Sequence, residues 1–273
     1  MGDQADAVGD WRVGRDPSIR LARRRNAFIW AVRAALVVLI LGLAQGLAPH
    51  LDPLGFSAPT SIFQTLTQWA KSGLLWSAFQ VTAEEILIGY IVGAVAGIVA
   101  GILLGANPVL SSILDPVVVA LYSVPKIALG PLLIVWFGIG LEPKLVLAAT
   151  LVFFVVFYAT FHGVREVDSD LVSMARVFGA SPRQVQRFIV VPAALSSILL
   201  GLKLGVPQAL FGAIVGEFIV SSQGLGYLVL FSASQLNISG VYAALLVLTV
   251  FAVLLTGGVD FIYGHMRHIK GEK

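Results

Sequence analysis

The sequence predicts an all-α integral membrane protein with six transmembrane helices. Of its 273 residues, 58% are hydrophobic and 12% are charged, and the mean hydropathy is +0.90. Soluble domains carry about 25% charged residues, so this composition favours a protein embedded in lipid. Apolar runs long enough to cross a hydrocarbon core of about 30 Å recur along the chain. We predict one transmembrane domain over residues 26–273, with spans at residues 28–48, 79–106, 115–137, 145–161, 193–220 and 241–263.

Clustered arginines predict how the chain is oriented. Arg20, Arg23, Arg24 and Arg25 precede the first span, and positive residues favour the cytoplasmic side. Residues 1–25 are therefore expected to form a cytoplasmic tail, and six crossings return the C-terminus to the same side. A nucleic-acid patch is the alternative for this cluster. Its position directly before a span, and a net charge of only +3, disfavour a nucleic-acid partner.

Five glycines recur every four residues along the second predicted span. They form one stripe on a helix and would let another helix approach closely. The stripe is either a dimer seam or a bundle seam, and the alternative is the general glycine content of membrane helices. Its members are Gly89, Gly93, Gly97, Gly101 and Gly105.

Three prolines predict that the third span is kinked or broken. Pro116, Pro125 and Pro131 lack the backbone donor that a continuous helix needs. Such breaks are tolerated in membranes where they line a cavity or are buried in protein. Lys126 lies at the central break, where it lines a translocation pathway, faces a cytoplasmic partner or snorkels to the headgroups.

Polar residues inside the spans are the other candidates for a pathway. Charged groups within a span are costly and usually face the interior of the bundle. Lys203, Gln208 and Glu217 belong to the fifth span, the best candidate for lining a pathway. Glu84 and Glu85 begin the second span, and the alternative for them is an interfacial pair with both head groups in water.

The polar segment between the fourth and fifth spans is predicted to form two helices joined by a tight turn. Asp168 and Asp170 can cap the first helix, because their oxygens accept from free N–H groups at a helix start. Gly179 suits the left-handed turn that ends it. Ser181 can then cap the second helix.

The first of these helices carries a short apolar face. Leu171, Met174, Ala175 and Phe178 recur at spacings of three and four residues. A short helix with such a face suits insertion into a groove on another protein.

The spacing within this segment resembles the cytoplasmic loop of permeases of ATP-binding-cassette importers. That family has the pattern EAA, three residues, G, nine residues, I, one residue, L-P. This chain keeps the spacing with Ser173-Met174-Ala175, Gly179, Ile189 and Pro192. Ser173 and Met174 replace the usual glutamate and alanine, so the salt bridge of that glutamate is not expected. Residues 125–129, 131–134, 136–140 and 224–227 also resemble the nitrate, sulfonate, taurine and bicarbonate branch.

The resemblance implies a function and a set of partners. The chain would be half of a homodimeric pore in a bacterial inner membrane, served by two ATPase subunits and a periplasmic or lipid-anchored solute-binding protein. The solute would be a small anion such as a sulfonate, taurine or nitrate, or a pyrimidine-like compound as in related carriers. The residues that couple to the ATPase would be Asp170, Leu171, Met174, Ala175, Phe178, Gly179, Ala180 and Pro192.

No catalytic or metal-binding pattern is evident in the sequence. The P-loop pattern is missing, so ATP and Mg²⁺ are expected in the partner ATPase and the chain itself is not expected to be an enzyme. A stand-alone ion-coupled transporter is the alternative function, with Glu84, Glu85 and Glu217 as coupling residues. A DNA-binding helix-turn-helix is disfavoured, because membrane spans flank the loop and its exposed stripe is apolar.

Overall fold

The computed structural model describes residues 17–269, and every regular element within that range is a helix. Five helices are long and apolar enough to cross a membrane, and a bent pair of helices provides a sixth span. The predicted fold class is therefore confirmed. The cytoplasmic tail predicted for residues 1–25 lies mostly outside the described residues.

Contacts divide the chain into two units, residues 1–60 and residues 61–273. The first unit contains α1, Pro17–Leu47, and a 3₁₀ turn, Ala48–His50. A span of 23 residues, Phe28–His50, lies in this unit. The exposed side chains along α1, such as Leu39 and Ile40, are those of a helix that faces lipid or another helix.

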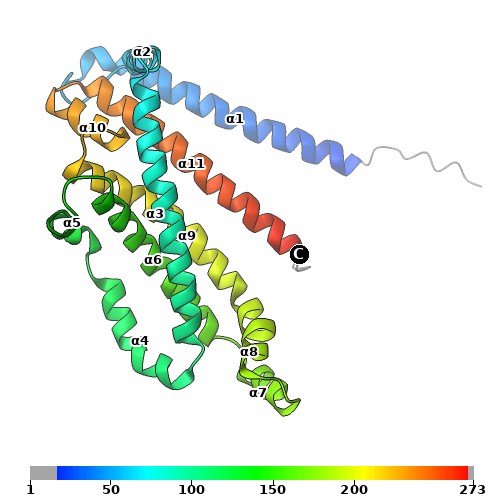
Figure 1. Ribbon diagram of the computed structural model, residues 1–273. Helices are drawn as coiled ribbons and strands as arrows, with labels where there is room; N and C mark the ends of the chain where they lie inside the picture. The colour runs from blue at the N-terminus through cyan, green and yellow to red at the C-terminus, as the bar shows by residue number, and fades with distance from the viewer. Residues whose placement is uncertain (1–16, 270–273) are drawn as a thin grey trace, which may run out of the picture. The chain divides into compact units, whose positions relative to one another are not determined.

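The second unit is a helical bundle (Figure 1). Its helix α6 packs between α3 and α9, while α10 packs against α9 and α11. The short helices α7 and α8 lie at one end of the bundle, and α10 lies at the opposite end. The boundary between the units falls in α2 (Pro59–Lys71). The other helices of the second unit are α3 (Leu74–Gly105), α4 (Pro108–Ser123), α5 (Gly130–Phe137), α6 (Glu142–Arg165), α7 (Ser169–Val177), α8 (Pro182–Val185), α9 (Val191–Val220), α10 (Leu225–Ser234) and α11 (Ile238–Ile269).

The glycine stripe of α3 forms the seam with α6. All five glycines are buried. A Cβ atom built on Gly97 would lie 2.9 Å from the Phe153 carbonyl oxygen and 3.0 Å from the Phe157 nitrogen. Because these are backbone atoms, they cannot move aside as a flexible side chain would. The stripe is thus a bundle seam within one chain, which lets two helix backbones touch.

The third span is broken at Pro125, whereas Pro116 lies inside the helix α4. Helix α4 ends at Ser123, a 3₁₀ turn runs from Lys126 to Leu129, and α5 begins at Gly130. The two halves of the span are bent by 74°. Pro131 lies in the first turn of α5, where its missing N–H would have had no helical partner in any case.

Several helices are longer than their predicted spans. Helix α3 begins at Leu74 rather than residue 79, and α6 covers Glu142–Arg165 rather than residues 145–161. The fifth span is part of one long helical stretch, Pro182–Val220, that includes a π-helical segment at Gln186–Val190. Hydropathy detects only the apolar part of a helix, whereas the helix itself continues until its backbone groups are capped.

Candidate functional site

Side-chain caps define the two helices of the loop at residues 165–192. Asp168 Oδ1 accepts a 2.8 Å hydrogen bond from the Asp170 N–H at the start of α7. Gly179 has φ +83°, the left-handed conformation that ends the helix. Ser181 and Gln184 form a reciprocal capping box at the start of α8, with hydrogen bonds of 2.8 and 3.4 Å. The predicted helix–turn–helix is confirmed.

One side of α7 is an exposed apolar ridge. The side chains of Val177 and Phe178 are 87% and 84% exposed, and those of Leu171 and Met174 are about half exposed. We define these four residues as the α7 ridge. An apolar ridge on a short, well-capped helix fits a groove on another protein.

The opposite side of α7 is attached to the bundle. Val172 and Ala175 pack against a buried cluster that includes Val164 at the end of α6 and Val185 in α8. Ala175, predicted to share the apolar face with Leu171, Met174 and Phe178, is partly buried. It lies at the edge of that face, and its short side chain packs against the cluster. Since the cluster extends to Ala194 and Ile198 of α9, α7 is packed onto two long helices at once.

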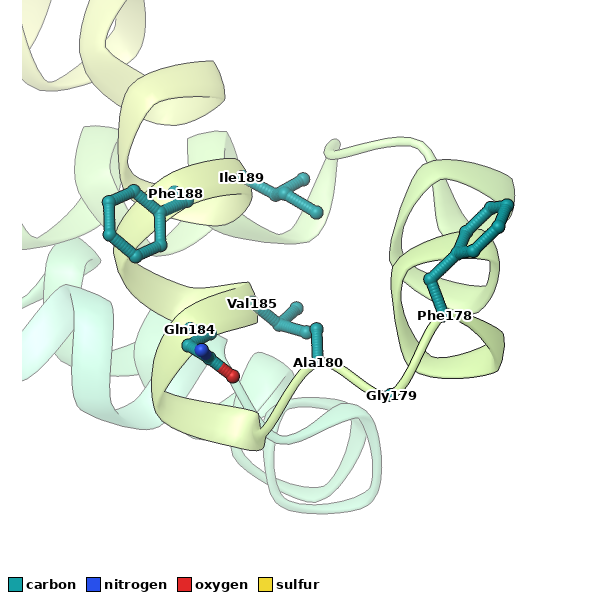
Figure 2. Close-up of a pocket in the computed structure, with 7 residues that line it drawn as sticks. All are labelled: Phe178, Gly179, Ala180, Gln184, Val185, Phe188 and Ile189. Carbon is teal, nitrogen blue, oxygen red and sulfur yellow. The ribbon is translucent and has the colours of Figure 1, made fainter.

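A hollow of about 340 Å³ lies beside the α7 ridge. Figure 2 shows Phe178 on one side, the turn at Gly179 and Ala180 below, and the following helix on the other side. That helix contributes Gln184, Val185, Phe188 and Ile189. Phe188 is 68% exposed, so apolar surface continues from the ridge across the hollow. Pro192, predicted to belong to this region, lies one turn further on, where the π-helical segment gives way to α9.

A buried ion pair lies at the other end of the bundle. Lys144 Nζ of α6 donates to Glu85 Oε1 of α3, and the Glu85 side chain is fully buried. Lys144 Nζ also donates to Ser221 Oγ at 3.3 Å. Burying two charges is tolerated only when they are paired in this way. Sequence analysis missed Lys144 because it precedes the predicted fourth span, although a lysine in the first turn of a long membrane helix is a signal that could have found it.

Glu217 of α9 caps α10 from outside that helix. Its carboxylate accepts from the Gly226 N–H at 2.5 Å and the Tyr227 N–H at 3.1 Å. Thr82 Oγ1 of α3 donates to Glu217 Oε1 at 2.5 Å and accepts from the Leu225 N–H at 2.8 Å. Side chains of two other helices thus satisfy the first three N–H groups of α10, and a carboxylate at a helix start is favourable.

The two neighbouring glutamates of α3 have different environments. Glu84 is exposed and Glu85 is buried, so the interpretation of both as an interfacial pair is wrong for Glu85. Glu85 and Glu217 make contacts that join α3, α6, α9 and α10. A role for Glu84, Glu85 or Glu217 in a pathway stays a prediction.

Lys126 stabilises the break in the third span. Its ammonium donates to the Tyr122 carbonyl at 2.5 Å and the Val124 carbonyl at 3.1 Å, both at the end of α4. It also lies 4.6 Å from the centre of the Phe154 ring and 5.2 Å from that of Tyr122. Two of the three ammonium N–H groups bond to the protein, so one remains for a further acceptor.

Lys203 has a partner that sequence analysis did not identify. Its Nζ lies 2.6 Å from Asp260 Oδ1 of α11, and both side chains are nearly half exposed. Gln208, further along α9, is partly buried. The structure thus brings Glu85 and Glu217 into side-chain contact and places Lys126, Lys203, Gln208 and Glu84 in different surroundings.

Over residues 17–269, no cluster of three or more histidine, cysteine, aspartate or glutamate side chains has the arrangement of a metal site.

Comparison with known families gives a match over most of the bundle. Residues 93–268 match the model of the family described as "Binding-protein-dependent transport system inner membrane component". The putative aliphatic sulfonates transport permease protein SsuC of Bacillus subtilis is 30% identical and covers 92% of both chains. The riboflavin transport system permease protein RibX of Chloroflexus aurantiacus is 35% identical, over 72% of this chain and 74% of its own.

A solved structure shows the same fold. An inward-facing form of the MetNI methionine ABC transporter contains a chain that superposes with a TM-score of 0.61. The match covers 69% of this chain and 94% of that chain, at 22% sequence identity.

Proposed function

The chain belongs to the family of binding-protein-dependent transport system inner membrane components, and on that premise we propose that it moves a small anionic solute, such as an aliphatic sulfonate, across a bacterial inner membrane. It would act as the permease subunit of an ATP-driven importer. Family membership favours this function over a stand-alone ion-coupled transporter. The assembly would contain a second copy of the chain, two ATPase subunits that bind ATP and Mg²⁺, and a solute-binding protein.

The α7 ridge is the observation that supports ATPase docking most directly. Four apolar side chains project from a capped helix of nine residues and its C-cap, and they are 49–87% exposed among the residues that the structure describes. A groove on the cytoplasmic ATPase would bury them. The α7 end of the bundle would then face the cytoplasm, and the positive residues of the sequence would place both termini on that side of the membrane as well.

The packing of α7 suggests how ATP-driven motion would reach the membrane. Val172 and Ala175 attach α7 to the cluster at the ends of α6 and α9. Well-packed clusters move as units rather than deforming. A displacement of α7 by the ATPase would therefore move α6 and α9 together, and α3 would follow because its glycine seam holds it to α6.

Two features support an anionic solute. The relative from B. subtilis is named for aliphatic sulfonates. Within this chain, Lys126 lies at a broken span and keeps one N–H group for an acceptor, whereas Lys203 is already paired with Asp260. The RibX relative favours a second candidate, an aromatic heterocycle, for which the Tyr122 and Phe154 rings beside Lys126 would supply stacking surface.

The proposal can be tested with the complete transporter. The chain would be co-expressed with the ATPase encoded next to it and reconstituted in lipid nanodiscs. We expect one binding protein loaded with a sulfonate to stimulate ATP hydrolysis. Stimulation by a riboflavin-loaded protein instead would replace the anionic solute with the heterocycle, and no complex with the ATPase would refute the permease assignment.

A pair of variants tests the docking surface separately. Phe178→Asp places a charge on the α7 ridge and should abolish co-purification of the ATPase. Leu236→Asp is the matched control, because Leu236 is also an exposed apolar residue, at 67%, but lies in the turn between α10 and α11. Equal ATPase recovery with both variants would contradict docking at α7.

A further inference from the structure

A second cleft lies under α7, on the side away from the ridge. It has a volume of about 510 Å³ and is bordered by the end of α3, the first turns of α4, the end of α6, the inner side of α7 and the π-helical segment. Its polar lining includes Ser111, Ser112, Ser173 and Gln186. The cleft is distinct from the hollow beside the ridge, with which it shares only Val185.

The charge in the cleft is positive. Arg165 and Arg176 line it, and no acidic side chain is among its lining residues. Arg165 is partly neutralised by Asp115, whose Oδ1 lies 2.5 Å from Arg165 Nη1. Arg176 forms no ion pair or side-chain hydrogen bond with any residue that the structure describes. Its guanidinium therefore keeps five donors in the planar fork that matches carboxylate, sulfonate and phosphate oxygens.

A second donor in the cleft lacks an acceptor. The Gln186 Nε2 atom is buried and makes no hydrogen bond. A buried amide N–H without an acceptor is costly, so most such groups in folded proteins find one. Gln186 is also the first residue of the π-helical segment, and π-helical turns within α-helices are frequent at functional sites.

From this lining we propose that the cleft binds one small oxyanion group, a phosphate, sulfate or sulfonate, through Arg176, Gln186 and the Ser173 hydroxyl. The same chemistry is available from a free cytoplasmic anion and from the headgroup of an anionic lipid. The cleft accommodates either, because it is partly open and lies beside the ends of three long helices. Binding at this site does not depend on the proposed transport function.

The position of the cleft implies a regulatory effect, which does rest on the proposed function. A bound oxyanion would lie between α7 and the bundle, bridging Arg176 of α7 to Gln186 of the next helix. It would therefore add a polar link to the apolar attachment through Val172 and Ala175. An anion that accumulates in the cytoplasm would in this way alter how α7 transmits the motion of the ATPase.

Anion binding can be measured on the purified full-length chain without the ATPase. The chain would be delipidated in a neutral detergent and its thermal midpoint followed with sodium methanesulfonate against sodium chloride at equal ionic strength. For the wild type we expect the thermal midpoint to rise with methanesulfonate concentration until it saturates. Arg176→Gln should raise the methanesulfonate concentration at half-saturation at least tenfold. Arg183→Gln is the matched control, because Arg183 is an exposed arginine of the same loop that does not line the cleft.

Gln186→Leu provides an independent test with two effects of opposite direction. Removing the unpaired amide should raise the midpoint in chloride, because a buried unsatisfied donor is lost. The same change should reduce the response to methanesulfonate. A variant that was merely misfolded would instead lower the midpoint in both salts.

Lipid-binding measurements distinguish the two sources of the oxyanion, a free anion and a lipid headgroup. Native mass spectrometry would compare retention of phosphatidylglycerol and phosphatidylcholine by the wild type and Arg176→Gln. Selective phosphatidylglycerol retention that Arg176→Gln loses assigns the cleft to a lipid headgroup, whereas a methanesulfonate response without lipid retention assigns it to a free anion. Equal behaviour of wild type, Arg176→Gln and Arg183→Gln in both measurements overturns the proposal.

Discussion

Replacing Lys144 with methionine should destabilise the end of the bundle that contains α10. The change removes the only cation paired with Glu85 among the described residues, and the Glu85 side chain is fully buried. Breaking a buried ion pair by deleting one partner costs about 3–5 kcal/mol. For a chain of this size that corresponds to a fall in thermal midpoint of about 6–20 °C, at about 2–4 °C per kcal/mol.

The double variant Lys144→Met/Glu85→Leu distinguishes this reasoning from a simple packing defect. With both charges removed, no unpaired carboxylate remains, and apolar replacement of a buried pair is often neutral or stabilising. We therefore expect the double variant to recover most of the midpoint lost by Lys144→Met. Both proteins would be compared by tryptophan fluorescence during heating in the same detergent.

Lys203→Met is the matched control for this experiment. It also removes a lysine from an ion pair between helices, but the Lys203 and Asp260 side chains are 41% and 45% exposed. An exposed pair contributes only about 0–1 kcal/mol. The reasoning is refuted if Lys144→Met is no more destabilising than Lys203→Met, or if the double variant is as unstable as the single one.

Three further predictions follow from the packing. Thr82→Val removes a hydroxyl that both donates to Glu217 and accepts from the Leu225 N–H of α10. The loss should cost about 1–3 kcal/mol of stability and speed hydrogen exchange at the start of α10. The control Thr65→Val loses only a local hydrogen bond within α2 and should leave exchange at α10 unchanged. Gly97→Leu should reduce the yield of folded protein from membranes, because overpacking a tight seam costs about 1–3 kcal/mol or more. Gly42→Leu is the control and should leave the yield unchanged, because a Cβ there meets nothing within 4 Å. Equal yields of the two variants would contradict the seam. Gly179→Val should reduce the amount of ATPase that co-purifies, since a branched residue at φ +83° costs about 1–2 kcal/mol or more at the turn beside the α7 ridge. Gly179→Asn should retain most of the co-purified ATPase, because asparagine tolerates this conformation.

Local sequence signals predicted the features that depend on neighbours along the chain. The caps at Asp168 and Ser181, the turn at Gly179 and the break at Pro125 all came from bonds or sterics within a few residues, and the structure confirms each. Helix ends were less well predicted. Hydropathy reports the apolar part of a helix, but capping and packing decide where the helix ends.

The four-residue periodicity predicted the glycine stripe but not the helix that packs against it. The four-residue spacing required a closely packed neighbour for α3, and dimer and bundle seams were equally compatible with it. The structure selects α6, because Gly97 and Gly101 meet the backbone and side chains of residues 153–160. A stripe describes one surface, whereas its complement lies on a segment some fifty residues away in the chain.

What the sequence determined by itself was the helical membrane fold, its broken third span and the loop with the α7 ridge. Only the tertiary structure decided the roles of the charged residues: it separated exposed Glu84 from buried Glu85, paired Lys203 with Asp260 and directed Glu217 to α10. The physical reason is that a helix follows from bonds between residues three or four positions apart. The free energy of a buried charge depends instead on which opposite charge or N–H group another helix brings to it.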